Sequence, residues 1–432
     1  MYWEEALETL DRGRLESLQL ERLRKTLNLA QRSPYYSQLP QLAEFLRGGL
    51  SSVAQIAELP LTTKEDLRRA FPWGMLATER SEVVRLHSSS GTTGNPTVIY
   101  HDRHDLASWA NLVARSLFSV GVRPSDVFQN ICGYGLFTGG LGFQYGAERL
   151  GCLSIPAGAG NSLRQIKLMR DFGTSVVHAI PSYLGRLHDV FKEEGLDPRR
   201  DTCLRTLVIG AEAHSEEYRQ RVEELFGAKA YNSFGLSEMN GPGVAFECEQ
   251  QAGLHVWEDA YLVEILDPQT LQAVAEGEIG ELVMTTLDRQ AMPLLRYRTR
   301  DLTRFLPGPC ACGRSHRRLD RIAGRSDDMF IVKGCNIFPM QIESLLMKLP
   351  EVGDDYRISL ETIQDQDEMI VEVEVKRDWF NGDMALLDRL QQHITRLIRD
   401  EVLLRPQVKL VEPGFLPKAE GKAIRVFDRR RK

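Results

Sequence analysis

The residues from Ser88 to Thr97 form a run of serine, threonine and glycine in which hydroxyl groups and uncovered backbone N–H groups are abundant. Such a run suits a loop that closes over phosphate oxygens, because glycine lets the backbone approach closely and both kinds of group can donate hydrogen bonds. The chain has no G-x-x-x-x-G-K-[ST] pattern of the usual nucleotide-triphosphate loop. Taken alone, the run is more typical of a flexible surface loop. Its interpretation therefore depends on the other motifs.

Four further segments follow this run in order: residues 134–140 (YGLFTGG), 231–238 (YNSFGLSE), 296–301 (RYRTRD) running on to 324–328 (GRSDD), and 416–422 (LPKAEGK). Together the five resemble the signature motifs of the adenylate-forming enzyme superfamily, and they are most similar to its phenylacetate–coenzyme A ligase family. The resemblance covers nearly the whole chain. It implies ATP-dependent activation of an aryl carboxylic acid, phenylacetate or a close analogue, through an acyl-AMP intermediate, followed by transfer to coenzyme A.

The resemblance also implies a nucleotide site. The residues that would bind ATP or AMP are Ser88, Ser89, Ser90, Gly91, Thr92, Thr93, Gly94, Glu212, Tyr231, Asn232, Ser233, Phe234, Gly235, Ser237, Asp301 and Arg325. Residues 88–94 would wrap the β- and γ-phosphates, and Glu212 with residues 231–234 would frame the adenine. Asp301 would accept both ribose hydroxyl groups, which requires an ionised bidentate acceptor.

Three residues are implied to be catalytic: Glu238, Asp327 and Lys422. Glu238 would ligate Mg²⁺, which prefers carboxylate oxygens. Asp327 stands at the position of the hinge about which the small domain rotates, and Lys422 would reach the α-phosphate and the carboxylate during adenylation only. Some features depart from the family pattern, and Cys335, which stands where relatives often have valine, is one that packing explains. Asn95 stands where relatives commonly carry lysine, and Lys418 could compete for the role of Lys422.

The acid would bind beside Tyr134, Phe137, Thr138 and Gly139, where aromatic rings alternate with glycines that leave space for a flat apolar molecule. Core packing explains Phe137 equally well on sequence alone. The resemblance favours an arylacetic acid, while a benzoate or an indoleacetate stays open. Two alternative functions also stay open: acyl transfer to a carrier protein or an amine, and a catalytically silent nucleotide-binding protein.

A second constellation consists of Cys310 and Cys312, one residue apart, with Cys248 and His255 upstream. Three thiolates and an imidazole could hold a structural Zn²⁺ with four ligands. His316 could replace His255 as the fourth ligand, and the alternative is a set of thiols that bind no metal. The site would stabilise the strand-rich part of the chain and take no part in the acyl chemistry.

The pattern of apolar residues predicts an α/β fold with two domains. Residues 1–324 would form a large domain of mostly parallel β-α-β sheets plus a small strand-rich subdomain, with strands at 261–266 and 280–284. Residues 325–432 would form a small α+β domain, because valines alternate with glutamates over 371–375 and apolar residues share one helical face over 386–398. The resemblance implies that this domain is mobile. Ligands of such a fold bind beyond the carboxyl ends of parallel strands.

Composition narrows the class of protein. The 432 residues exceed one ordinary core, and 42% hydrophobic with 26% charged residues is typical of a globular chain. A formal net charge of −6 argues against nucleic acid as the main partner. No signal-peptide pattern or membrane-length apolar run is present, and seven cysteines indicate reduced thiols and a cytoplasmic location. The resemblance implies that the partners are the acid, ATP and coenzyme A, and that a homodimer is possible.

Overall fold

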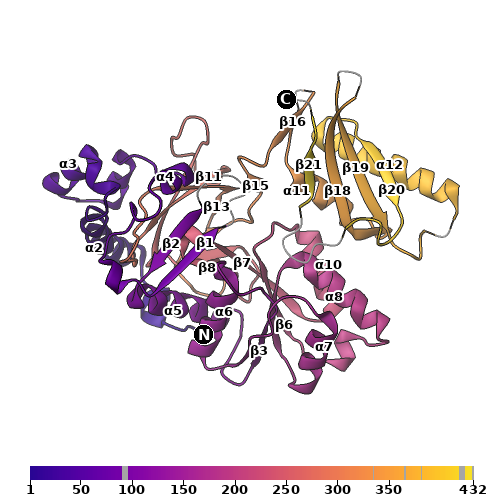
Figure 1. Ribbon diagram of the computed structural model, residues 1–432, viewed down its shortest axis with the longest axis horizontal. Coiled ribbons are helices and arrows are strands. Elements are labelled where there is room, and N and C mark those ends of the chain that lie inside the picture. The colour runs from indigo at the N-terminus through magenta and orange to yellow at the C-terminus, as the bar shows by residue number, and fades with distance from the viewer. Residues whose placement is uncertain (90–95, 334, 364–365, 381, 418–423, 431–432) are drawn as a thin grey trace. The chain divides into compact units, whose positions relative to one another are not determined.

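The computed structural model describes residues 1–89, 96–333, 335–363, 366–380, 382–417 and 424–430. The chain forms two compact units (Figure 1). The first unit contains residues 1–179, 202–211 and 231–321, and the second contains residues 180–201, 212–230 and 322–432. Among the described residues, no helix is both long enough and apolar enough to cross a membrane.

The first unit is built on a sheet of nine strands in the order β13-β14-β9-β8-β7-β6-β5-β3-β4. Four neighbouring strands are parallel: β3 (Val127–Asn130), β4 (Leu153–Ile155), β5 (Val176–Ala179) and β6 (Thr206–Gly210). Helices α6 (Thr138–Leu150) and α7 (Ser162–Asp171) connect the first three of them, as crossovers between parallel strands require. The predicted β-α-β units are therefore present in this half of the sheet.

The other half of the same sheet is antiparallel. Its strands are β7 (Lys229–Leu236), β8 (Gly241–Phe246), β9 (Leu254–Val256), β14 (Arg318–Leu319) and β13 (Phe305–Leu306). The change of direction follows from the short connection between β7 and β8, the 3₁₀ turn η4 (Ser237–Met239), which cannot serve as a parallel crossover. Gly235 is required there, because a Cβ atom on it would lie 2.0 Å from the carbonyl oxygen of Gly241.

Two smaller sheets complete the first unit. Strands β1 (Arg85–Ser89) and β2 (Thr97–His101) pair antiparallel, so that the serine- and threonine-rich run connects their ends. Strands β10 (Tyr261–Leu266), β11 (Gly280–Thr286) and β12 (Tyr297–Thr303) form an antiparallel meander, which confirms the strands predicted at 261–266 and 280–284. Further helices of this unit are α1 (Glu5–Glu8), α2 (Arg12–Ala30), α3 (Pro40–Gly48), α4 (Lys64–Arg69) and α5 (Arg103–Ser119).

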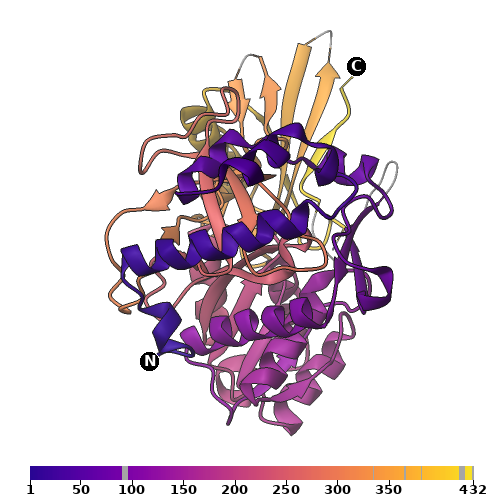
Figure 2. The same cartoon turned by 90° about the vertical axis from the view of Figure 1, so that its left-hand side faces the viewer.

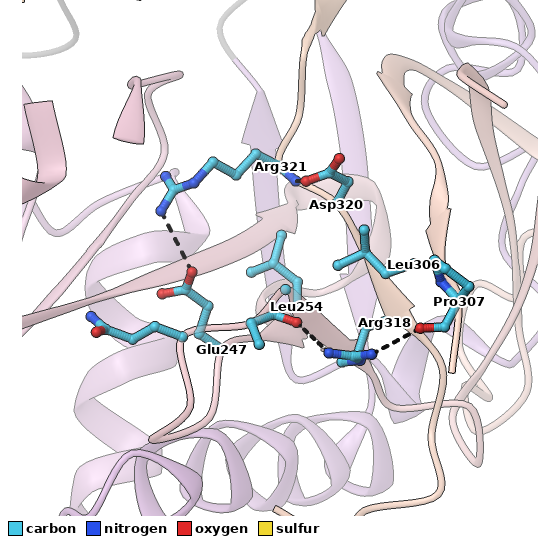
Figure 3. A pocket seen from close by; sticks show the side chains of 10 residues that line it. Glu247, Leu254, Leu306, Pro307, Arg318, Asp320 and Arg321 are labelled. Atoms are coloured by element: carbon cyan, nitrogen blue, oxygen red, sulfur yellow. Dashed lines mark hydrogen bonds and ion pairs between the residues drawn. The ribbon is translucent and has the colours of Figure 1, made fainter. Parts of the chain in front are cut away.

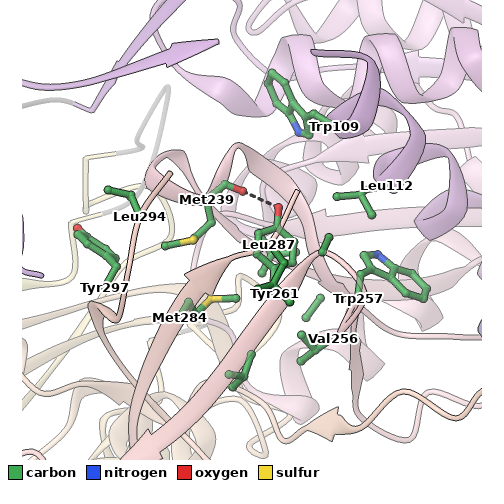
Figure 4. Close-up of a cluster of buried hydrophobic side chains, with 14 of the residues drawn as sticks. Trp109, Leu112, Met239, Val256, Trp257, Tyr261, Met284, Leu287, Leu294 and Tyr297 are labelled. Carbon is green, nitrogen blue, oxygen red and sulfur yellow. Dashed lines mark hydrogen bonds between the residues drawn. The ribbon is translucent and has the colours of Figure 1, made fainter. Parts of the chain in front are cut away.

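The N-terminal helix α2 packs close to the meander, and Figure 2 shows it running across these strands. Its Gln19 side chain donates to the carbonyl oxygen of Glu258 at 2.8 Å, and its Arg22 side chain donates to that of Asp259 at 2.7 Å. The core beneath contains Trp109, Trp257 and Tyr261 (Figure 4). The Tyr261 hydroxyl donates to the carbonyl oxygen of Met239 at 2.9 Å. This core therefore supports the η4 turn that carries Glu238.

The second unit has a mixed sheet in the order β20-β19-β18-β21, with β18 (Val352–Ile363), β19 (Gln366–Val375), β20 (Gln407–Val411) and β21 (Val426–Asp428). Helix α12 (Met384–Val402) buries Leu390, Ile394 and Ile398, as the helical pattern predicts. The unit also contains α8 (Pro181–Glu193), α9 (Pro198–Asp201), α10 (Glu216–Phe226), β16 (Phe330–Val332), β17 (Cys335–Ile337) and α11 (Pro339–Leu346).

Helix α10 joins the C-terminal residues of this unit through specific polar contacts. The backbone N–H of Ser215, the N-cap of α10, donates to the Glu343 carboxylate of α11 at 3.0 Å. Arg221 of α10 forms an ion pair with Asp354 of β18 at 2.8 Å. Residues 325–432 all belong to this unit, while the domain boundary expected at residue 324 stays a prediction.

Candidate active site

Two of the predicted motifs meet at the carbonyl oxygen of Leu136. This oxygen accepts hydrogen bonds from the backbone N–H of Ser88 at 2.9 Å and from Nδ1 of His87 at 3.0 Å. The end of β1, where the phosphate run begins, is thereby fixed to the segment expected to hold the acid. Ser89 continues β1 opposite Thr97, and the residues expected to contact phosphate from Ser90 to Gly94 lie outside the described part of the chain.

The segment 134–140 borders open space. Phe137 is 55% exposed, so that it is not a core residue in the described structure. A Cβ atom on Gly139 would meet nothing within 4 Å. Thr138, by contrast, is buried, and its hydroxyl lies 3.3 Å from the Ser237 hydroxyl. Thr138 therefore links the acid segment to the turn that bears Glu238.

The Glu238 turn is fixed from beneath by a buried arginine. A guanidinium N–H of Arg289 donates to the Glu238 carbonyl oxygen at 2.6 Å, and another donates to the Tyr100 carbonyl oxygen of β2 at 3.4 Å. Glu238 itself is 6% exposed. A buried carboxylate in the turn between β7 and β8 offers oxygen ligands of the kind that Mg²⁺ prefers. Arg289 was not predicted from the sequence, because it lies before the RYRTRD motif without any spacing that marks it.

Two buried histidines pack beside this turn. His87 of β1 and His101 of β2 lie against Trp109, with ring centroids 5.7 and 5.6 Å from the indole ring. Burial lowers the pKa of both histidines, so that both are neutral at physiological pH. Among the described residues, Nε2 of His87 and both ring nitrogens of His101 have no hydrogen-bond partner. Sequence analysis did not identify this pair.

The RYRTRD motif begins one residue before β12, runs along that strand and is held by ion pairs with β10 and β11. Arg296 makes two contacts with the Glu264 carboxylate at 3.0 and 2.8 Å, and Arg298 makes two with the Glu281 carboxylate at 2.8 and 2.7 Å. Both arginines are mostly buried. The backbone N–H of Asp301, which follows them, donates to the Thr299 hydroxyl at 3.0 Å. The motif arginines thus fix the strand on which Asp301 stands.

The predicted adenine segment lies on β7, in the middle of the large sheet. The backbone N–H of Asn232 donates to the Glu247 carboxylate at 2.7 Å. Tyr231 and Ser233 are buried, whereas Phe234 is partly exposed. A Cβ atom on Gly210 of β6 would lie 2.4 Å from the Ser233 carbonyl oxygen, so this position requires glycine for the two strands to approach.

Three predicted residues that the structure describes belong to the second unit. The Glu212 carboxylate accepts hydrogen bonds from the backbone N–H and the hydroxyl of Ser182, both at 3.0 Å. Arg325 forms a bidentate ion pair with Asp327 at 2.9 and 3.0 Å. The predicted nucleotide contact and the predicted hinge residue are therefore partners of each other. Lys422, its possible competitor Lys418, and Asn95 lie outside the described residues.

The predicted zinc ligands come together in the first unit. The thiol sulfurs of Cys248 and Cys310 are 3.7 Å apart, and the Cys312 sulfur lies 3.3 Å from Nε2 of His255. All four ligand atoms lie within 4.8 Å of one another. Two thiolates bound to one tetrahedral Zn²⁺ at about 2.3 Å would be separated by about 3.8 Å. The pKa of Cys312 is lowered mainly by its hydrogen bond with Cys248 and, to a smaller extent, by its hydrogen bond with His255.

The structure decides between the two candidate histidines. Nδ1 of His255 donates to the His316 carbonyl oxygen at 3.1 Å, so that its other nitrogen presents a lone pair to the three thiols. The ring of His316 is used elsewhere: its Nε2 lies 3.0 Å from the Leu7 carbonyl oxygen, and its Nδ1 lies 2.8 Å from the Glu258 backbone N–H. His255 is therefore the fourth residue of the cluster.

A pocket of about 410 Å³ lies apart from the predicted site residues, none of which lines it. Figure 3 shows that its arginines are engaged by neighbouring groups. Arg321 pairs with Glu247 at 3.5 Å, and Arg318 donates to the carbonyl oxygens of Ala252 at 2.6 Å and Pro307 at 3.2 Å. The guanidinium groups of Arg318 and Arg321 are therefore already bonded to other groups of the protein.

Two protein families match parts of the chain. The AMP-binding enzyme family matches residues 51–287, and the AMP-binding enzyme C-terminal domain matches residues 334–430. Among curated proteins, the phenylacetate–coenzyme A ligase of Thermus thermophilus is 42% identical over 100% of both chains. That of Pseudomonas putida is 42% identical over 98% of this chain and 96% of its own length.

Solved structures agree with this family. A 2-hydroxyisobutyryl-CoA ligase in the postadenylation state, in complex with R3-HIB-AMP, superposes with a TM-score of 0.93 at 29% identity, over 99% of this chain and 92% of that one. The same ligase in the thioesterification state, with 2-HIB-AMP and CoA, gives a TM-score of 0.73 at 31% identity, with the same shares covered. The chain therefore belongs to the AMP-binding enzyme family, as an AMP-forming acid–coenzyme A ligase.

Proposed function

We propose that the acid substrate is phenylacetate or a closely related arylacetic acid. In the first half-reaction, a carboxylate oxygen attacks the α-phosphorus of ATP, and pyrophosphate leaves. In the second, the thiol of coenzyme A attacks the acyl carbon, the thiol proton is lost, and AMP leaves with the former carboxylate oxygen. The identity of about 42% to two phenylacetate–coenzyme A ligases over nearly the whole length supports this substrate.

The observation that carries the proposal is the double hydrogen bond to the Leu136 carbonyl oxygen, from Ser88 N–H and His87 Nδ1. It fixes the start of the phosphate run beside the glycine-rich acid segment, so that a carboxylate and the α-phosphate of ATP can be held in reacting positions. Tyr134, Phe137, Thr138 and Gly139 would bound the acid, and the open space beside Gly139 supports this assignment.

The remaining assignments follow the motifs. Residues 88–94 would bind the β- and γ-phosphates, residues 231–235 with Glu212 and Ser237 the adenosine, and Asp301 the ribose. Arg325 would contact the nucleotide. Glu238 would hold Mg²⁺, which supplies positive charge to the phosphates as charge develops on them. The buried position of the Glu238 turn, fixed by Arg289, supports a rigid ligand.

We further propose that residues 325–432 form a mobile domain that turns about Asp327, and that Lys422 acts only during adenylation. The two different states reported for the 2-hydroxyisobutyryl-CoA ligase support such an alternation. Arg325 and Asp327 form a bidentate ion pair. Rotation about Asp327 would therefore also move the Arg325 guanidinium, which we propose to contact the nucleotide.

Pyrophosphate release with a panel of acids tests the proposal. Phenylacetate and related aryl acids should release pyrophosphate from ATP, and coenzyme A should convert the adenylate to a thioester with release of AMP. Turnover of short aliphatic acids only would reject the aryl assignment. Adenylate that accumulates while coenzyme A is not consumed would instead point to a carrier protein or an amine as the acceptor.

We also propose that Cys248, His255, Cys310 and Cys312 bind one structural Zn²⁺ per chain. The sulfur–sulfur distance of 3.7 Å and the orientation of His255 support this assignment. Elemental analysis of protein purified without chelator should find one zinc per chain, and a value near zero would reject the site. Reduced thiols in this cluster agree with a cytoplasmic location. A homodimer, common among relatives, is proposed and is testable by light scattering.

A further inference from the structure

We infer that Asn130, locked in place by His178, is the positioning residue of the acid site. The inference rests on the proposed acid-binding segment at residues 134–140. Asn130 is the last residue of β3 and is fully buried. It therefore stands at the carboxyl end of a parallel strand, next to the point where the chain enters the glycine-rich segment.

The side chain of Asn130 uses all of its hydrogen-bonding capacity. Its Nδ2 group donates to the Gly140 carbonyl oxygen at 2.7 Å and to the Tyr134 hydroxyl oxygen at 3.0 Å. Its Oδ1 atom accepts from the backbone N–H of Cys132 at 3.3 Å and contacts Nδ1 of His178 at 2.9 Å. One amide thus connects Tyr134 and Gly140, the two ends of the segment, with Cys132 just before it.

The backbone partners fix the orientation of this amide, because the Gly140 carbonyl oxygen can only accept and the Cys132 N–H can only donate. Oδ1 therefore faces His178, and Nδ1 of His178 must carry the proton. The other ring nitrogen then faces the Cys132 sulfur at 3.6 Å as an acceptor. Burial lowers the pKa of His178 to about 3, which keeps the ring in this neutral form.

The network continues through Tyr134 to helix α6. The Tyr134 hydroxyl, which accepts from Asn130, donates to Oε1 of Gln144 at 3.0 Å. The ring of His178 packs on Phe143 of the same helix, with centroids 3.8 Å apart. Around this fixed ring the chain leaves room, since Cβ atoms on Gly133 and Gly135 would meet nothing within 4 Å. Tyr134 is therefore held rigidly beside open space, as a wall against a flat acid must be.

Steady-state kinetics with phenylacetate and ATP tests the inference. Asn130→Asp replaces the Nδ2 donor by an oxygen that faces the Gly140 carbonyl oxygen and the Tyr134 hydroxyl oxygen. Because the bonds that hold the segment are lost, KM for the acid should rise about tenfold. KM for ATP should rise less than KM for the acid, since the predicted adenine and ribose contacts stand on β7 and β12 and not on the segment that Asn130 holds. Asn28→Asp is the matched control, because Asn28 is exposed on α2 and bonds only within its helix; its kinetics should equal those of the wild type.

A pair of variants at His178 separates positioning from packing. Asn offers an N–H close to the place of Nδ1, so His178→Asn keeps the donor to Asn130, whereas His178→Leu fills the space but removes the donor. We expect a larger rise in acid KM for His178→Leu than for His178→Asn. An equal or larger rise for His178→Asn, or parallel rises in KM for acid and ATP, would overturn the inference.

The outcome also separates this inference from the proposed function. If the wild type releases no pyrophosphate with any aryl acid, the proposed function fails. If the wild type is active and all the Asn130 and His178 variants keep its acid KM, the function stands and the positioning role is rejected.

Discussion

Substitution of one zinc ligand should lower stability by an amount that the site geometry allows to be estimated. Cys312→Ser removes the thiolate that lies 3.3 Å from His255, while the carbonyl oxygen of residue 312 can still accept from the Tyr2 hydroxyl. Structural zinc contributes about 10–16 kcal/mol in small metal-dependent folds. An equal share for each of four ligands is about 3 kcal/mol. At about 2–4 °C per kcal/mol, this corresponds to a drop in Tm of roughly 6–12 °C.

Thermal unfolding followed by circular dichroism, with zinc content measured on the same samples, tests this estimate. Cys203→Ser is the matched control, because Cys203 is an exposed thiol outside the cluster. The acid preference of the Cys312→Ser protein should be unchanged, since none of the predicted acid-binding residues belongs to the cluster. Equal Tm values for the two variants, with no zinc in the wild type, would refute the reasoning.

Four further outcomes are expected. Lys422→Ala should slow acyl-AMP formation by on the order of 10²-fold while sparing thioester formation from supplied acyl-AMP, and Lys418→Ala should affect neither half-reaction measured separately. Glu238→Gln should slow adenylation by on the order of 10²-fold and raise the Mg²⁺ concentration for half-maximal rate. Burial lowers the pKa of His178 from its usual 6.5 to about 3. Between these two pH values His178 is protonated in the unfolded chain and neutral in the folded chain. Stability should therefore fall as pH drops from about 6.5 to 4, and His178→Asn should flatten this slope in chemical denaturation. Gly235→Ala should abolish soluble expression, since no space exists for a Cβ atom 2.0 Å from a carbonyl oxygen.

Local patterns were sufficient to predict the elements that carry the motifs. Alternation at 371–375 and the apolar face at 386–398 correspond to β19 and α12, because one buried face imposes the period of each element. The antiparallel half of the large sheet was not predicted. Its direction depends on the three-residue turn between β7 and β8, and a turn of that length is not visible in a pattern of apolar residues.

The cluster of three cysteines and one histidine was predicted because few residue types bind Zn²⁺ and two of the cysteines are one residue apart in sequence. The choice between His255 and His316 required the fold, since both lie near the cluster and only the hydrogen bond to Nδ1 distinguishes them. Asn130 and Arg289 escaped notice for a related reason. Their roles come from contacts between distant segments, and a lone asparagine or arginine carries no local signal.

The most direct test of acyl-AMP chemistry is the fate of the carboxylate oxygen. Phenylacetate labelled with ¹⁸O in its carboxylate is incubated with the enzyme, ATP, Mg²⁺ and coenzyme A, and the products are weighed by mass spectrometry. If a carboxylate oxygen attacks the α-phosphorus, each AMP carries one ¹⁸O atom and pyrophosphate carries none. Label in phosphate or pyrophosphate, or AMP without label beside newly formed thioester, would contradict the adenylate mechanism.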